Sequence, residues 1–186
     1  MDGLIEVFSR IVEQFTRLNT QGKLVYKIFI NNHHSTKWTV KNMNRNDLRY
    51  KDFPLQSYDK IRYCDTDRQG HVNNALFSTF LETGRTELLY GMEPLHTEDC
   101  AFVIAHQRID LLSEITWPGT VEIGTAVVKV GNSSLTLFQG LFQNELLVAR
   151  ADTVIVQMNE STRKSQALAS VTKEELTKYS ASIENE

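Results

Sequence analysis

The sequence predicts an α+β domain in which one long helix packs on a five-stranded antiparallel sheet. Three observations support this fold class. Residues 75–90 carry apolar side chains at helical spacing, one strand-like segment precedes them, and four strand-like segments joined by short turns follow them. Short hairpin connections make neighbouring strands antiparallel. One helix can cover only one face of such a sheet, so the other face needs a partner or solvent.

The first 53 residues are predicted to lie outside this domain. Residues 1–19 have apolar side chains at helical spacing, which predicts an amphipathic helix, and residues 24–30 have strand character. Residues 31–53 are polar and lack a structural period, so we interpret them as a linker. The predicted division is an N-terminal extension and linker at 1–53 and a compact domain at 54–186. We expect residues 1–42 to be peripheral to the chemistry of that domain.

The domain is predicted to begin with a strand at 57–64 and a polar loop at 65–74, which leads into the long helix at 75–90. Gly84 inside this helix costs about 1 kcal/mol relative to alanine. A close approach by a neighbouring strand would explain a glycine at this position.

The second half of the domain is predicted to be a run of strands. They fall at residues 101–112, 121–130, 135–142 and 146–158, with turns at 117–119, 131–133 and 143–145. A short helix is predicted to close the chain at 171–182. Thr172 and Glu175, three residues apart, fit a capping box at its start.

The composition favours a single soluble domain in the cytoplasm. The chain has 186 residues, 41% of them apolar and 23% charged, and a net charge of -3, so no charge pattern for nucleic acid or membrane is present. Glu6, Arg10 and Glu13 interrupt the apolar positions that a signal peptide needs, and the acids Asp2, Glu6 and Glu13 argue against a mitochondrial presequence. Cys64 and Cys100 are predicted to be free thiols, as in a reducing cytosol.

The loop at 65–74 concentrates the side chains that can do chemistry. It reads Asp65-Thr66-Asp67-Arg68-Gln69-Gly70-His71-Val72-Asn73-Asn74 and ends where the long helix begins. The first turn of a helix presents unpaired N–H groups and a positive dipole end, which can polarise a carbonyl. A carboxylate aimed at the same point can act as a nucleophile or as a general base on water.

Other interpretations of this loop fit less well. Asp65, Asp67 and Gly70 match three positions of a calcium-binding loop, but Leu76 stands where the bidentate glutamate belongs. Neither cysteine has a partner at zinc-ligand spacing. A plain helix-capping turn would not need a second acid and a histidine. We therefore predict no metal and no cofactor.

The loop string, followed by Phe77, Glu82 and Arg85, resembles the signature of the 4-hydroxybenzoyl-CoA thioesterase-like family. This family is the acyl-CoA thioester hydrolase branch of the hot-dog fold, and the resemblance covers roughly residues 55–180. It implies one long helix wrapped by a curved five-stranded antiparallel sheet. It also implies a homodimer or homotetramer whose sheets join edge to edge, with active sites at the subunit interface and acyl-CoA as the substrate.

The resemblance also implies roles for individual residues. The catalytic carboxylate falls on Asp67, and His71 assists in positioning or proton transfer. The backbone N–H that polarises the thioester carbonyl falls near Asn74, while Asp65 holds the loop. The residues expected to bind substrate are Gly70, Asn73 and Asn74.

Two positions depart from the family pattern. Phe77 stands where a tyrosine is expected, and the turn at 131–134 lacks the basic residues that contact CoA phosphates in some members. Arg163 or Lys164 is the expected replacement. The predicted function is hydrolysis of acyl-CoA to the free acid and CoA. An acyl-carrier-protein thioesterase and a non-catalytic acyl-CoA-binding module are the alternatives.

Overall fold

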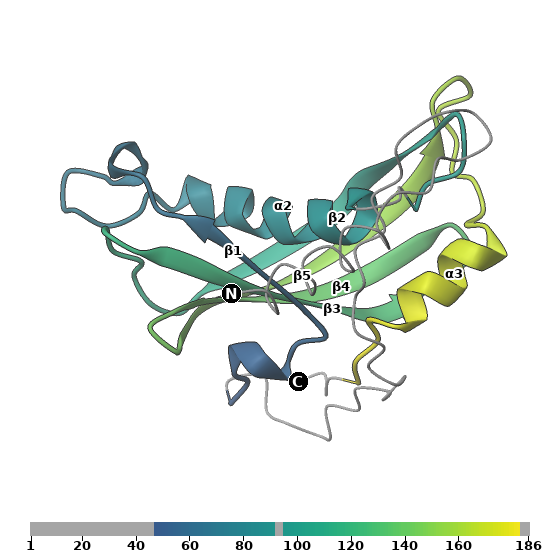
Figure 1. Cartoon of the computed structure of the whole chain (residues 1–186). Helices are drawn as coiled ribbons and strands as arrows, with labels where there is room; N and C mark the ends of the chain where they lie inside the picture. The colour runs from purple at the N-terminus through teal and green to yellow at the C-terminus, as the bar shows by residue number, and fades with distance from the viewer. Residues whose placement is uncertain (1–46, 92–94, 183–186) are drawn as a thin grey trace, which may run out of the picture. The chain divides into compact units, whose positions relative to one another are not determined.

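The structure, a computed structural model, describes residues 47–91 and 95–182. The helix and strand expected within residues 1–30 lie outside this range. The described part contains one long helix, three short helical segments and five strands (Figure 1). In chain order these are η1 (Tyr50–Asp52), β1 (Leu55–Lys60), η2 (Tyr63–Asp65), α2 (Ala75–Tyr90), β2 (Cys100–Leu111), β3 (Thr120–Val130), β4 (Ser134–Gln143), β5 (Leu146–Asn159) and α3 (Ser170–Thr177).

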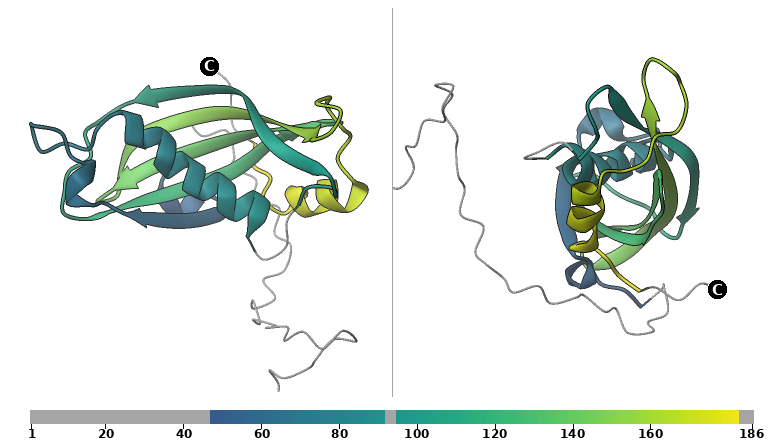
Figure 2. Two further views of the ribbon diagram at one scale, coloured as in Figure 1. Left: turned by 90° about the horizontal axis from the view of Figure 1, so that it is seen from above. Right: turned by 90° about the vertical axis from the view of Figure 1, so that its right-hand side faces the viewer.

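The five strands form a single antiparallel sheet in the order β1-β3-β4-β5-β2, which confirms the predicted fold class. The sheet curves around α2, which lies across one of its faces (Figure 2). Within the described residues β2 pairs only with β5, so its other edge carries no strand. No helix in these segments is both long and apolar enough to span a membrane.

The helix packs closely on the sheet because apolar side chains fill the space between them. Phe77, Phe80 and Leu81 of α2 are at most 2% exposed and belong to this core. At Gly84, an added Cβ would lie 2.7 Å from Oγ1 of Thr125 and 2.8 Å from Cγ2 of Ile123. The close approach predicted from this glycine is therefore confirmed.

A buried polar network also joins α2 to the sheet. Gln139 Nε2 donates to the Leu81 carbonyl and to Thr125 Oγ1, both at 3.0 Å. Arg85 Nη1 donates to Gln139 Oε1 at 3.3 Å. Burial lowers the pKa of Arg85, and the negative charge of Glu82 acts in the opposite direction. Because each buried group in this network has a partner, the network fixes the helix against one place on the sheet.

The opposite face of the sheet is covered by a segment that the sequence analysis assigned to the linker. Leu48 and Phe53 are 5% and 3% exposed, and they pack with Phe138 and Phe142 in a second core cluster. The Phe53 ring stacks on Phe138 with centroids 5.9 Å apart, and it lies so close over Gly124 that a Cβ there would clash with it. The packed domain therefore includes these residues, and the expected start at residue 54 is too late.

Two other elements differ in their bounds from the sequence prediction. The first strand ends at Lys60 instead of residue 64, because the chain turns into η2. The last helix begins at Ser170, and Thr172 is not its cap. Thr172 is buried in the first turn, and its hydroxyl donates to the Leu95 carbonyl at 2.7 Å. The predicted hairpin turn after β4 is confirmed, with Asn144 and Glu145 both at positive φ.

Candidate active site

The polar loop at residues 65–74 is held by hydrogen bonds both before and after its two acids. Ile61 N donates to the Gly119 carbonyl at 3.1 Å, which ties the chain after β1 to the turn before β3. Asp65 is 8% exposed; its Oδ2 accepts from Arg62 N at 2.6 Å, and its carbonyl accepts from Asn73 N at 2.9 Å. Asp65 thus joins the beginning of the loop to its end, as expected of a structural acid.

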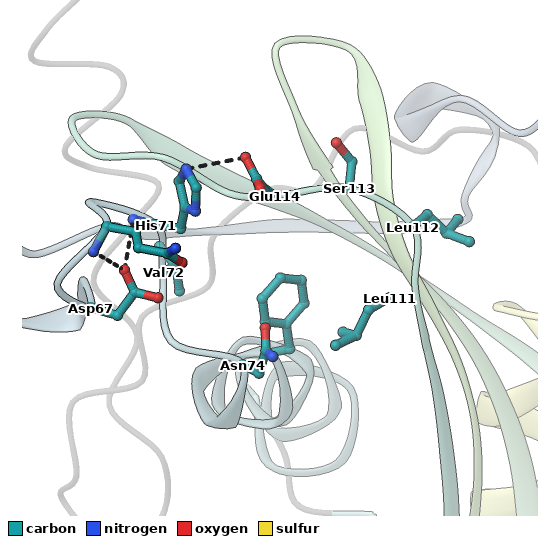
Figure 3. A pocket seen from close by; sticks show the side chains of 10 residues that line it. Asp67, His71, Val72, Asn74, Leu111, Leu112, Ser113 and Glu114 are labelled. Carbon is teal, nitrogen blue, oxygen red and sulfur yellow. Dashed lines mark hydrogen bonds and ion pairs between the residues drawn. The ribbon is translucent and has the colours of Figure 1, made fainter.

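Asp67 is the acid that reaches the surface. Its Oδ1 accepts two backbone N–H groups, from Gln69 at 2.8 Å and from His71 at 3.2 Å. The Asp67 N–H in turn donates to the His71 carbonyl at 2.8 Å. Gly70 has φ +86°, a left-handed conformation that favours glycine and lets the loop reverse between these partners. Asp67 Oδ2 accepts no hydrogen bond from any described residue, and it faces the helix start (Figure 3).

The start of α2 leaves one backbone donor unused. Asn73 Oδ1 accepts from Ala75 N at 3.0 Å, and the Asn73 carbonyl accepts from Leu76 N at 2.9 Å. The Phe77 N–H donates to the Asn74 carbonyl at 3.3 Å. In the part of the chain that the structure describes, no group accepts from the Asn74 N–H. This N–H sits at the positive end of the helix dipole, where it can stabilise negative charge on an oxygen.

A cavity of about 550 Å³ opens between the loop, the start of α2 and the connection from β2 to β3. It is lined by Asp67, Gln69, His71, Val72, Asn74, Phe77, Leu111, Leu112, Ser113 and Glu114. Three of the five expected site residues, Asp67, His71 and Asn74, therefore share one cavity. Gly70 and Asn73 do not line it: Gly70 shapes the turn and Asn73 caps the helix.

Glu114 is one of the lining residues that the sequence does not predict. His71 Nε2 lies 3.1 Å from Glu114 Oε2, and Figure 3 shows the imidazole turned toward this carboxylate. The two side chains are 33% and 67% exposed. Glu114 comes more than forty residues after His71 and follows a strand, so no local pattern in the sequence marks it.

The basic residues expected to meet CoA phosphates are not near this cavity within one chain. Leu111, at the end of β2, lines the cavity, whereas the loop that carries Arg163 and Lys164 follows β5 beyond Asn159. Asn159 pairs with Cys100 at the opposite end of β2. Arg62 and Arg68, which flank the acids of the active loop, are two exposed cations at this end of the molecule.

Comparison with known proteins shows what this arrangement is similar to. Residues 61–176 match the model of a family described as the thioesterase-like superfamily. The acyl-CoA thioester hydrolase YbgC of Escherichia coli is 27% identical over 114 residues, which cover 59% of this chain and 85% of YbgC.

Solved structures are similar as well. A thioesterase from Thermus thermophilus, complexed with coenzyme A and zinc, is 25% identical, has a TM-score of 0.58, and covers 67% of this chain and 92% of its own. A predicted thioesterase from Bacillus stearothermophilus is 24% identical, with a TM-score of 0.63, and covers 69% of this chain and 97% of its own.

Proposed function

Because this chain belongs to the thioesterase-like superfamily and is a thioester hydrolase, we propose that it cleaves acyl-CoA to the free acid and CoA, with Asp67 as the central catalytic residue. One observation carries the proposal. The free oxygen of the Asp67 carboxylate and the unpaired N–H of Asn74 border the same cavity, which has Phe77, Leu111 and Leu112 as an apolar wall. This arrangement supplies an attacking group, a carbonyl-polarising donor and space for an acyl group.

The reaction can be written with these groups alone. The thioester oxygen accepts a hydrogen bond from the Asn74 N–H, and Asp67 Oδ2 takes a proton from a water molecule as that water attacks the carbonyl carbon. The electron pair of the C=O bond moves to the oxygen and returns as the C–S bond breaks. The proton held by Asp67 then goes to the departing CoA thiolate. In the alternative route Asp67 attacks the carbon itself, and water cleaves the resulting anhydride.

His71 and Glu114 lie on one side of the cavity, where they orient the groups beside Asp67. The His71 N–H and the Gln69 N–H hold Asp67 Oδ1, so the carboxylate presents its other oxygen to the cavity. Glu114 Oε2 lies 3.1 Å from His71 Nε2, and this ion pair with the protonated ring orients the imidazole. We propose that the backbone N–H of His71 positions Asp67. The imidazole ring lies at the rim of the cavity, where it can give a proton to the leaving thiolate.

The proposed substrate is tested by comparing two thioesters of the same acyl group. We expect thiol release from acyl-CoA to have a higher kcat/KM than release from the matching acyl carrier protein, because a net charge of -3 does not favour an acidic partner protein, whereas single exposed cations such as Arg62 can meet the phosphates of CoA. The assay is run over a series from short aliphatic to aryl acyl groups. A preference for the carrier protein throughout the series would replace the CoA assignment, and tight acyl-CoA binding without any thiol release would contradict hydrolysis itself.

We also propose that the protein forms a homodimer through the free edge of β2. Ile104 and Leu111 on this strand are 50% and 48% exposed, which is large for apolar side chains on an edge strand. A cytoplasmic location is part of the proposal, supported by the free, exposed thiol of Cys64.

The N-terminal extension is proposed to be separate from both dimer and site. A variant that starts at Met43 loses residues 1–42 but keeps Leu48 and Phe53, which cover the sheet. We expect unchanged turnover per site and an unchanged dimeric mass in light scattering. A monomeric or insoluble truncated protein would show instead that the extension belongs to the packed domain.

A further inference from the structure

An exposed pair of aromatic side chains stands beside the candidate active site. Tyr63 and Trp117 are 75% and 47% exposed, yet their rings contact each other, with centroids 5.5 Å apart and planes at 79°. An edge-to-face pair holds both rings in place while leaving ring faces open to solvent. Large aromatic side chains presented in this way are typical of surfaces that bind a partner or a ligand.

The backbone under this pair is held rigidly. The buried side chain of Gln143 accepts from Thr116 N at 3.0 Å and donates to the Thr116 carbonyl at 2.7 Å, one residue before Trp117. The Tyr63 carbonyl accepts from Thr66 N at 3.3 Å and from Thr66 Oγ1 at 2.8 Å. A binding surface that is already ordered loses little conformational entropy when a ligand arrives.

The pair is joined directly to the rim of the cavity. Thr116 forms a β-bridge with His71, and Thr66 forms one with Val72. Bridged residues have Cα atoms about 5 Å apart, so Trp117, which follows Thr116, and Tyr63, three residues before Thr66, both lie close in sequence to residues that pair with the cavity lining. A ligand whose reactive end lies against Asp67 can therefore place its other end on Tyr63 and Trp117.

Positive charge lies next to the same rings. Arg62 precedes Tyr63, and its side chain is 60% exposed. Its guanidinium is 3.8 Å from the Asp59 carboxylate and 4.0 Å from that of Asp65, distances too long for strong hydrogen bonds, so its donors can reach an anion. Arg68 is exposed in the neighbouring loop. A flat aromatic platform with a guanidinium beside it suits a nucleotide base linked to phosphates.

We infer that Tyr63 and Trp117 bind the adenine ring of CoA by stacking, with Arg62 against the phosphates; this inference rests on the proposed acyl-CoA hydrolysis. An acyl chain is a poorer occupant of this position, because it would stay largely in water here, while the wall formed by Phe77, Leu111 and Leu112 offers it an apolar environment. The competing occupant is a protein surface, including a second copy of the chain.

The test uses the full chain and two substrates that carry the same acyl group, one on CoA and one on N-acetylcysteamine, a thiol without the nucleotide. Trp117→Ala and Tyr63→Ala are each expected to raise KM for the CoA thioester roughly tenfold, with little change in kcat. The kcat/KM for the N-acetylcysteamine thioester should stay at the parent value. Trp117→Phe, which keeps an aromatic face, should restore most of the loss.

Tyr58→Ala provides the matched control, because Tyr58 is 69% exposed on β1 and lies outside the cavity lining. Equal losses on both substrates, or none on either, would overturn the inference, as would a change in molecular mass caused by Trp117→Ala. Binding is also followed without turnover, as quenching of tryptophan fluorescence by adenosine 3′,5′-bisphosphate, which should disappear in Trp117→Phe. Quenching by this nucleotide in a protein that hydrolyses neither thioester would contradict the proposed reaction and support the adenine subsite.

Discussion

Asp67→Asn is expected to lower kcat for acyl-CoA by about 10²- to 10⁴-fold or more, the range that a lost general base or nucleophile gives. The substitution is well matched to the site. The asparagine retains an Oδ1 atom that can accept from the Gln69 and His71 N–H groups, so the loop keeps its hydrogen bonds. Only the oxygen that faces the cavity is replaced. The NH2 group that takes its place neither attacks a carbonyl nor accepts a proton from water.

Turnover is measured by thiol release at saturating substrate, with the melting temperature recorded for each variant. Asp47→Asn is the control for loss of one negative charge, because Asp47 is exposed at the start of the segment that lies on the other face of the sheet. An Asp67→Asn protein with parent-like turnover would remove Asp67 from the mechanism. A lowered melting temperature would instead point to a damaged loop, as we expect for Asp65→Asn.

Phe53→Ala is expected to lower the free energy of unfolding by about 3–5 kcal/mol, the usual cost of removing a buried phenylalanine ring. The ring is 3% exposed, stacks on Phe138, and meets Phe142 edge-on with centroids 5.8 Å apart. Its loss would also expose the face of the sheet at Gly124 and Gly140, which have no side chains to fill the space left by the ring.

The measurement is the denaturant midpoint and slope at one fixed protein concentration, since any dimerisation makes stability depend on concentration. Tyr58→Ala, an exposed aromatic truncation, should change stability by no more than about 0.5 kcal/mol. Turnover per folded molecule should survive Phe53→Ala, because the cavity lies on the helix side of the sheet. A loss below about 1 kcal/mol would mean that residues 47–53 contribute little to the folded domain.

The parts of the fold that were predictable have a regular period in the sequence. The helix at 75–90 was predicted to the residue, and β2 to β5 to within one residue at each end, because alternating or helical apolar patterns run through each of them. Phe53 and Leu48 were missed because two isolated apolar residues in a polar stretch carry no period. Their burial comes from the empty sheet face that receives them, which is a tertiary effect.

The site was predictable as far as it is local in sequence. Asp67, His71 and Asn74 lie within eight residues and could be grouped from the loop alone, whereas Glu114 reaches His71 only because β2 returns the chain to this end of the helix. The sequence predicts a substrate-binding role for Asn73, although an amide suits helix capping equally well. Its hydrogen bond to Ala75 N, visible only in three dimensions, makes it a helix cap.

The close contact at Gly84 has a consequence for how substrate selection could be altered in this enzyme. With Thr125 and Ile123 already touching the helix backbone, α2 cannot sink further toward the sheet, and the hydrogen bond from Gln139 to Leu81 opposes its lifting. The distance between α2 and the sheet is therefore fixed, and it limits the depth of the cavity. A larger acyl group would therefore have to be accommodated by replacing wall residues such as Phe77 or Leu111 with smaller ones, and not by a larger distance between helix and sheet.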